Sequence, residues 1–211
     1  MKYLFLGIIL FSLQLKAQTL NKSSLIAESK LHQEKLNKDF LNEEESPLSE
    51  KDRAVFKGLD FFPINEKYIV QAKFIRTPYE SPFTMATSTD RKSIYLKYGE
   101  LSFKIDGKIF SLNVYQNQRL LSDPEYKDYL FIPFTDLTNG NETYEVGRYL
   151  DFSIPKSNTV ILDFNKAYNP YCAYSGNYSC PIPPEENHLE IEIKAGVKKY
   201  YSPSSKEKKI N

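Results

Sequence analysis

The sequence predicts a mainly β protein, an antiparallel sandwich or barrel-like single domain with one or two N-terminal helices. Several short runs after residue 67 alternate apolar and polar residues, which is the period of a β-strand. The pair Asp106-Gly107 separates two of these runs, and this dipeptide is a strong hairpin signal. No long helical pattern lies between the later runs, which disfavours a parallel sheet with crossover helices.

The first 17 residues have the pattern of a cleavable signal peptide. Lys2 supplies a positive charge, residues 3–15 are almost all apolar, and Ala17 is a small residue suited to cleavage. The apolar run is shorter than the roughly 20 residues that a membrane-spanning helix needs. We therefore expect an exported chain, periplasmic or extracellular, that is cleaved near Ala17 and has no membrane span in its mature part.

Residues 18–48 are expected to form a helical segment. The polar stretch 20–45 carries a narrow apolar stripe that leaves out Leu31, and Ser23 or Ser24 is suited to cap its start. The acidic run 43–45 before Ser46-Pro47 should end it. The stripe comprises Leu25, Ile26, Leu36 and Phe40.

A second, shorter helix is expected over residues 50–57. Ser49 precedes Asp52 by three residues, which resembles a capping box, and Gly58 is suited to the position just after a helix. This helix should open a β domain of residues 49–197, followed by a basic, frayed tail of residues 198–211. The expected strands are 68–75, 94–98, 101–105, 108–114, 130–134, 149–154, 159–163 and 189–194.

Charge and motifs exclude several classes of function. Cleavage would remove two of the 28 basic residues, so 26 basic and 27 acidic residues would remain and the net charge would be −1. This charge argues against nucleic-acid binding. The sequence has no phosphate-binding glycine loop and no Gly-x-Ser-x-Gly motif, so it predicts neither a nucleotide cofactor nor a serine hydrolase elbow.

The two cysteines, Cys172 and Cys180, are expected to form a disulfide in an oxidising compartment. A zinc site or a catalytic dyad that combines them with His188 is the less favoured alternative, and we expect no metal site. The other histidine, His32, is interpreted as a surface residue of the first helix.

Residues 131–188 are the richest in groups that can make specific contacts. Arg148 offers a planar fork suited to a carboxylate or phosphate, and Asp136 and Asp163 are its expected internal partners. One interpretation is a buried Arg–Asp pair that holds long loops against the core. The other is a pocket for a small polar or anionic ligand. The candidate ligand-binding residues are Asp136, Tyr144, Arg148, Asp163, Asn165, Tyr168 and Asn169.

Three stretches of the chain resemble the bacterial and archaeal family DUF1684, a domain of unknown function. They are Phe-Lys-Gly-Leu-Asp-Phe-Phe-Pro (56–63), the segment 133–150 that contains Asn-Glu-Thr-Tyr-Glu-Val-Gly-Arg, and Leu-Asp-Phe-Asn-Lys-Ala-Tyr-Asn-Pro-Tyr-Cys (162–172) with its continuation to residue 196. The resemblance covers residues 56–197 and brings no established activity. Many relatives have Asn-Arg-Leu where this chain has Asn187-His188-Leu189, and this resemblance argues against a metal-binding or catalytic role for His188. Relatives without a signal peptide carry the cysteine pair too, which leaves a reduced pair open.

Three functions therefore remain as hypotheses. The first is a non-enzymatic exported domain that binds a small polar ligand or a partner at the loops of residues 136–188. The second is a hydrolase-type enzyme with Asp136, Asp163 or Cys172 as acid, base or nucleophile. The third is a structural role at the cell envelope. An enzyme would need one of these groups to face an open cleft beside Arg148.

Overall fold

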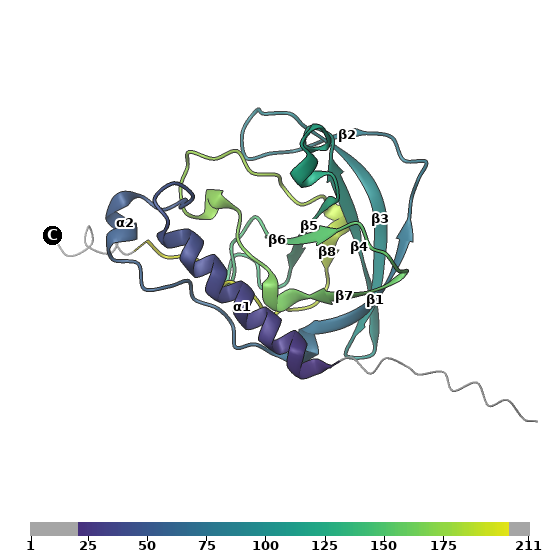
Figure 1. Ribbon diagram of the computed structural model, residues 1–211, viewed down its shortest axis with the longest axis horizontal. Coiled ribbons are helices and arrows are strands. Elements are labelled where there is room, and N and C mark those ends of the chain that lie inside the picture. Colours follow the sequence, from purple (N-terminus) through teal and green to yellow (C-terminus); the bar gives the residue numbers. More distant parts are fainter. Residues whose placement is uncertain (1–20, 203–211) are drawn as a thin grey trace, which may run out of the picture.

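The computed structural model describes residues 21–202, and it confirms the mainly antiparallel β architecture (Figure 1). Eight strands form one curled, half-barrel sheet in the order β6-β5-β4-β3-β1-β7, with β2 paired to β3 and β8 paired to β5. The strands are β1 (Ile69–Arg76), β2 (Phe83–Met85), β3 (Ser93–Ile105), β4 (Lys108–Asn117), β5 (Tyr129–Asp136), β6 (Arg148–Ser153), β7 (Thr159–Asp163) and β8 (His188–Leu189).

The longest pairing is the β3–β4 hairpin at the predicted Asp106-Gly107 turn. Both residues have positive φ, 50° and 78°, as a tight two-residue hairpin requires. The separate strands expected at 94–98 and 101–105 are one strand, with an irregularity between Lys97 and Gly99. A Cβ at Gly99 would lie 2.5 Å from the ring of Phe74, so a larger residue there would push β1 away.

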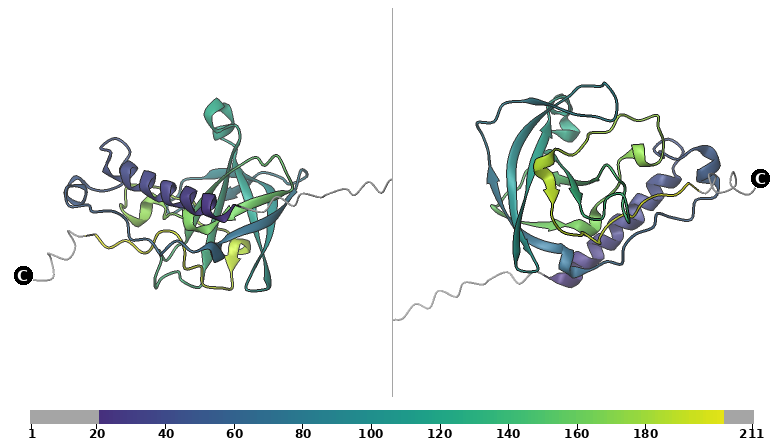
Figure 2. Two further views of the ribbon diagram at one scale, coloured as in Figure 1. Left: turned by 60° about the horizontal axis from the view of Figure 1, so that its bottom comes forward. Right: turned by 180° about the vertical axis from the view of Figure 1, so that it is seen from behind.

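The sheet curls around the main core, and its inward side chains come from alternate positions of each strand. In β5 these positions are Leu130, Ile132 and Phe134, each fully buried. Seen from behind, the strands curve around the C-terminal segment that begins at β8 (Figure 2). Leu189, Ile193 and Ala195 from that segment complete the core.

Helix α1 (Lys22–Leu41) lies along one side of the sheet (Figure 1). Its buried residues are Ser29 and Phe40. The helix is capped by Asn21, whose side chain accepts a hydrogen bond from the Ser24 N–H. The sequence predicts Ser23 or Ser24 at this position instead. Phe40 is buried and Leu31 is exposed, as the pattern predicts. Ile26 is exposed to 38%, contrary to the expected stripe, and Ser29 is buried in its place.

Helix α2 (Glu50–Ala54) has the predicted cap, since the Ser49 side chain accepts a hydrogen bond from the Asp52 N–H. The helix is shorter than the expected 50–57. Gly58 adopts a positive φ of 127°, but it lies beyond the cap at Val55, so it does not terminate the helix. Short 3-10 turns elsewhere connect the strands, among them η2 (Leu120–Ser122) and η4 (Phe164–Lys166).

The prediction of a strand at residues 189–194 is wrong. Only His188 and Leu189 pair with β5, and they pair in parallel. Beyond them the backbone bonds to buried side chains, because Ile193 N–H donates to Asp136 and its carbonyl accepts from Arg148. Val197 is buried, and the Lys198 N–H donates to the Asp60 carbonyl, so the first residue of the expected tail is bonded to the domain. Residues 203–211 of that tail lie outside the described residues.

Within residues 21–202, no helix is both long and apolar enough to cross a membrane. The expected signal peptide, residues 1–17, lies outside the described residues. Cys172 and Cys180 form a disulfide with a Cα–Cα distance of 6.2 Å.

Candidate functional site

Two features lie on opposite faces of β5 and β6. Inward positions carry Asp136 and Arg148 to one end of the main core, while the alternate positions Tyr129, Phe131, Tyr149 and Asp151 face the other way. Phe131 and Tyr149 belong to a second aromatic cluster, separate from the main core. The period of two along each strand therefore produces a sealed polar network on one face and a cavity on the other.

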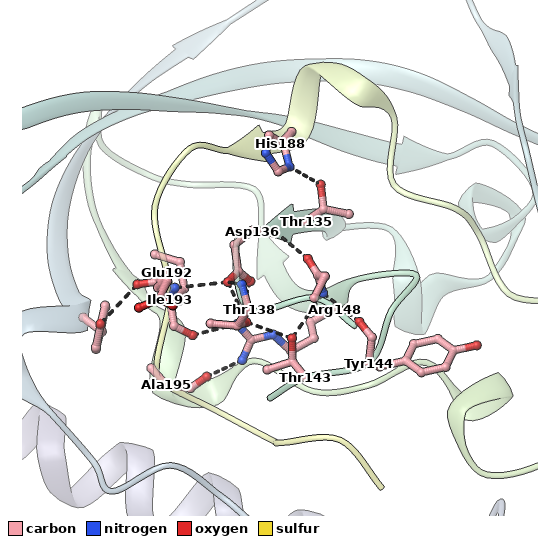
Figure 3. Close-up of polar contacts among 12 residues, drawn as sticks. Thr135, Asp136, Thr138, Thr143, Tyr144, Arg148, His188, Glu192, Ile193 and Ala195 are labelled. Carbon is pink, nitrogen blue, oxygen red and sulfur yellow. Dashed lines mark hydrogen bonds and ion pairs between the residues drawn. The ribbon is translucent and has the colours of Figure 1, made fainter. Parts of the chain in front are cut away.

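The sealed network is an ion pair between Arg148 and Asp136, the partners that the sequence predicts (Figure 3). Arg148 Nη2 donates to Asp136 Oδ2 at 2.8 Å and to the Ile193 carbonyl at 2.8 Å, and Nη1 donates to the Ala195 carbonyl. The exposed fractions of Arg148 and Asp136 are 0% and 2%. Burial lowers the pKa of the Arg148 guanidinium, and the carboxylate of Asp136 opposes that effect.

Donors also surround the second oxygen of Asp136. Thr138 donates to Oδ1 from its N–H at 2.9 Å and from its hydroxyl at 2.6 Å, and Ile193 N–H donates at 3.1 Å. Figure 3 shows the ring of Tyr144 pointing away from this cluster. Tyr144 contributes its carbonyl, which accepts from Asn139. The network joins the loop after β5 to β6 and to the C-terminal segment, and it offers no surface to a ligand.

Three further candidates anchor segments to one another. Asp163 accepts from the Ser29 hydroxyl of α1 at 2.6 Å and from both nitrogens of Asn165 at 2.9 Å. The Asn165 side chain also exchanges two hydrogen bonds with the backbone of Asn65. Asn169 donates to the Lys198 carbonyl, while its Oδ1 is buried and has no hydrogen-bond partner in the described part of the chain.

The alternate face of β5 and β6 forms one wall of a cavity of about 600 Å³. Helix α1 and the disulfide-closed segment around residues 170–181 supply other walls. Of the seven candidates, Tyr168 lines this cavity, and Asp163 borders a second one of about 550 Å³. The larger cavity is lined by His32, Lys35, Leu36, Asp39, Tyr95, Leu120, Tyr129, Phe131, Tyr149, Asp151, Tyr168, Pro170, Tyr171, Tyr178, Ser179, Cys180 and Pro181.

The polar centre of this cavity is the carboxylate of Asp151. The hydroxyls of Tyr129 and Tyr168 both donate to its Oδ1, at 2.7 and 2.6 Å. Burial and the charge of Asp151 raise the pKa of both tyrosines well above the usual range, so both remain neutral donors. The Tyr149 hydroxyl donates to the Pro181 carbonyl, and burial raises its pKa as well.

His32 is half-buried in the wall of the cavity, where the sequence predicts a surface residue. Its Nε2 atom is buried and has no hydrogen-bond partner among residues 21–202. Burial and the neighbouring charge of Lys166 lower the pKa of the ring, which favours neutral imidazole. The ring therefore adds no positive charge to the cavity wall.

The disulfide closes the segment that carries Tyr178 and Ser179, and Cys180 itself lines the cavity. A thiol nucleophile at Cys172 is thereby removed. His188 lies elsewhere, with Nδ1 2.9 Å from the Thr135 hydroxyl. Among residues 21–202, no group of three or more His, Cys, Asp or Glu side chains is arranged to hold a metal ion.

Sequence reasoning missed most of the cavity, because its residues come from six separate stretches of the chain. One signal was present. Tyr129, Leu130, Phe131 and Ile132 are apolar or aromatic on both phases of β5, and a strand apolar on both faces must be covered on both. The covering layer on the second face is the wall of aromatic side chains around the cavity.

Comparison with known proteins gives a family and a fold. No curated protein matches the chain. A solution NMR structure of an uncharacterised protein from Haloarcula marismortui is 30% identical, with a TM-score of 0.65, and the match covers 83% of this chain and 95% of that one. Residues 54–198 match the family described as "Protein of unknown function (DUF1684)". With most of the domain matched, the chain belongs to the DUF1684 family.

Proposed function

We propose that this protein is an exported binding domain that holds a small organic ligand in the tyrosine-lined cavity between α1, β5, β6 and the disulfide-closed segment. The observation that carries the proposal is the cavity itself. Its volume of about 600 Å³ falls in the range typical of ligand pockets, about 300–1,000 Å³. Seven of its 17 lining residues are tyrosine or phenylalanine, and a few polar groups converge on it, as in most small-molecule sites.

The cavity walls are tied to rigid elements, which favours a preformed site. The ring centroids of Phe131 and Tyr149 are 4.6 Å apart, and those of Tyr149 and Tyr168 are 5.8 Å apart. Tyr168 also exchanges two backbone hydrogen bonds with Tyr149. A site that is ordered before binding loses less conformational entropy when the ligand enters.

The buried network supports the cavity from the other face of the sheet. Arg148 and Asp136 connect β5, β6 and the C-terminal segment, so they fix the strands that present Tyr129, Tyr149 and Asp151. In this proposal Arg148, Asp136, Asp163, Asn165 and Asn169 position the loops of residues 136–188, and Tyr168 contacts the ligand.

The hydrolase alternative has less support. Asp136 is enclosed by Arg148 and Thr138, and Cys172 is bonded to Cys180. Asp163 accepts hydrogen bonds from Ser29 and Asn165 rather than facing a cleft beside Arg148. Export is part of the proposal on two grounds, the signal-like pattern of residues 1–17 and the disulfide.

The test is to isolate the exported protein from its native cells and to search for a co-purifying small molecule by native mass spectrometry. Leu120→Trp should block the site, because Leu120 lines the cavity. Leu121→Trp is the matched control, since the neighbouring Leu121 is exposed to 43% and lines no part of it. We expect the ligand in the wild type and the control and its loss from Leu120→Trp.

Equal retention of the ligand by both variants would place binding elsewhere. If no small molecule co-purifies and no member of a fragment library shifts the ring resonances of Tyr149 or Tyr168, the proposed function is wrong and a structural role at the envelope is favoured. Fractionation of native cells tests export, and finding the protein in the cytoplasm with its first 17 residues attached would contradict it.

A further inference from the structure

We propose that the cavity selects an organic ammonium ion, that is, an amine with an apolar or aromatic body. This inference rests on the proposed function, since it names the class of ligand for the same site. Three independent features of the cavity lead to it: its charge, the direction of its hydrogen bonds and its aromatic walls.

The charge of the cavity is negative and uncompensated. Of its charged side chains, Lys35 and Asp39 neutralise each other across a contact of 2.6 Å. Asp151 has no ion-pair partner among residues 21–202, and the two side chains bonded to it are neutral tyrosines. Asp151 is exposed to solvent, so water screens its charge; it would still attract a ligand cation and repel an anion at short range.

Three tyrosine hydroxyls of the cavity are occupied as hydrogen-bond donors. Tyr129 and Tyr168 both donate to the same oxygen, Oδ1 of Asp151, and Tyr149 donates to the Pro181 carbonyl. The Oδ2 atom of Asp151 receives no hydrogen bond from the described residues. Oδ2 of Asp151 is therefore an open acceptor beside three occupied hydroxyls, which suits a ligand with N–H donors.

His32 adds no positive charge to the cavity. Burial and the charge of Lys166 lower the pKa of its ring, which favours the neutral imidazole. Its Nε2 atom is buried and makes no hydrogen bond with residues 21–202, so it is enclosed in the wall rather than open to a ligand. Asp151 and His32 stand on different elements, β6 and α1, and both line the cavity.

The walls suit a cation with an apolar body. Six tyrosines and Phe131 line the cavity, and the faces of such rings attract ammonium groups within about 6 Å of the ring centroid. The volume of about 600 Å³ exceeds what a simple alkylammonium ion fills, which favours an amine that carries a ring or chain. The Arg148 fork, which suggested an anionic ligand from the sequence, is 0% exposed and cannot contribute.

The experiment compares three probes with the same body and different charge: 2-phenylethylamine, 2-phenylethanol and phenylacetate. Binding to the full mature chain is followed at neutral pH by protein NMR, through the ring resonances of Tyr149 and Tyr168. We expect the amine to bind at least about tenfold more tightly than the alcohol, and the acid to bind more weakly still. Asp151→Asn keeps the acceptor for the tyrosines and removes the charge, so it should abolish most of the preference for the amine.

Glu190→Gln is the matched control, because Glu190 is an exposed carboxylate outside the cavity, and it should keep the full preference. Should Asp151→Asn fail to fold, the wild-type series still decides. Equal or tighter binding of the alcohol or the acid overturns the ammonium inference and leaves the proposed binding function standing. Absence of binding by all three probes also overturns the ammonium inference, and the native ligand search then judges the proposed function separately.

Discussion

Replacing Arg148 with methionine tests whether the buried network is structural. Methionine fills part of the volume of the arginine stem but leaves the Asp136 carboxylate buried without its cation. The change also removes the donors to the carbonyls of Ile193 and Ala195. We therefore expect a large loss of stability, whichever ligand the protein binds.

The magnitude follows from what is left unpaired. Removing one member of a buried ion pair typically costs about 3–5 kcal/mol. Asp136 keeps three donors at Oδ1, from Thr138 and Ile193, which places the cost toward the lower end of that range. Because a domain of this size unfolds at a cost of about 5–15 kcal/mol, the variant should still fold, with a Tm lower by roughly 10 °C.

Urea unfolding followed by circular dichroism measures the effect. Arg119→Met is the control, because Arg119 is exposed, and it should change the free energy of unfolding by less than about 0.5 kcal/mol. In the variant with both Arg148→Met and Asp136→Leu, part of the lost stability should return, because no buried charge is left unpaired. A single variant Arg148→Met as stable as the wild type, but unable to bind ligand, would refute the structural assignment.

Three further predictions concern the contacts around the cavity. Ser29→Ala should lower the free energy of unfolding by about 1–2 kcal/mol, because Asp163 loses a buried hydrogen bond of 2.6 Å; the exposed Ser23→Ala is the control, and equal effects would contradict the assignment. Replacing Cys172 and Cys180 with serine should lower the free energy of unfolding by about 2.5 kcal/mol through chain entropy and weaken ligand binding. In the wild-type protein, mass measurement after alkylation without reductant should find no labelled cysteine, and two labelled thiols would contradict the disulfide. Because burial lowers the pKa of His32, the unfolded chain binds a proton more readily, so stability should fall as the pH drops below about 6.5, down to the folded pKa. His32→Gln should reduce that acid sensitivity in pH-dependent unfolding, and an unchanged profile would contradict the role of His32.

Local signals in the sequence predicted most strands, but not the path of the C-terminal segment. The Asp106-Gly107 turn and the alternation in β1 depend on neighbours in the chain, so they can be recognised without the fold. The alternation of residues 189–194 is real, since Leu189, Ile193 and Ala195 are buried. Its backbone, however, is paired with the side chains of Asp136 and Arg148 instead of a strand, which only the tertiary structure can specify.

The candidate site, too, could be predicted from the sequence only in part. The predicted ion pair of Arg148 with Asp136 formed because a buried guanidinium must find a carboxylate, and the sequence offered few nearby. The cavity could not be foreseen, since His32, Tyr95 and Asp151 are far apart in the chain and meet only when α1 docks on the sheet.

The two faces of β5 and β6 also couple the sealed network to the cavity. Phe134 pairs with Arg148 and Phe131 with Asp151 in one register, so the ion pair that fixes Arg148 also fixes where Asp151 and Tyr149 stand. A slip of one residue would exchange the faces, placing Asp151 in the main core and the Arg148 charge in the cavity. The cost of burying Asp151 there without a partner excludes the slipped register more strongly than apolar packing alone. The charged residues of both faces therefore specify the register, and the negative charge of the cavity is a direct consequence of which face received Arg148.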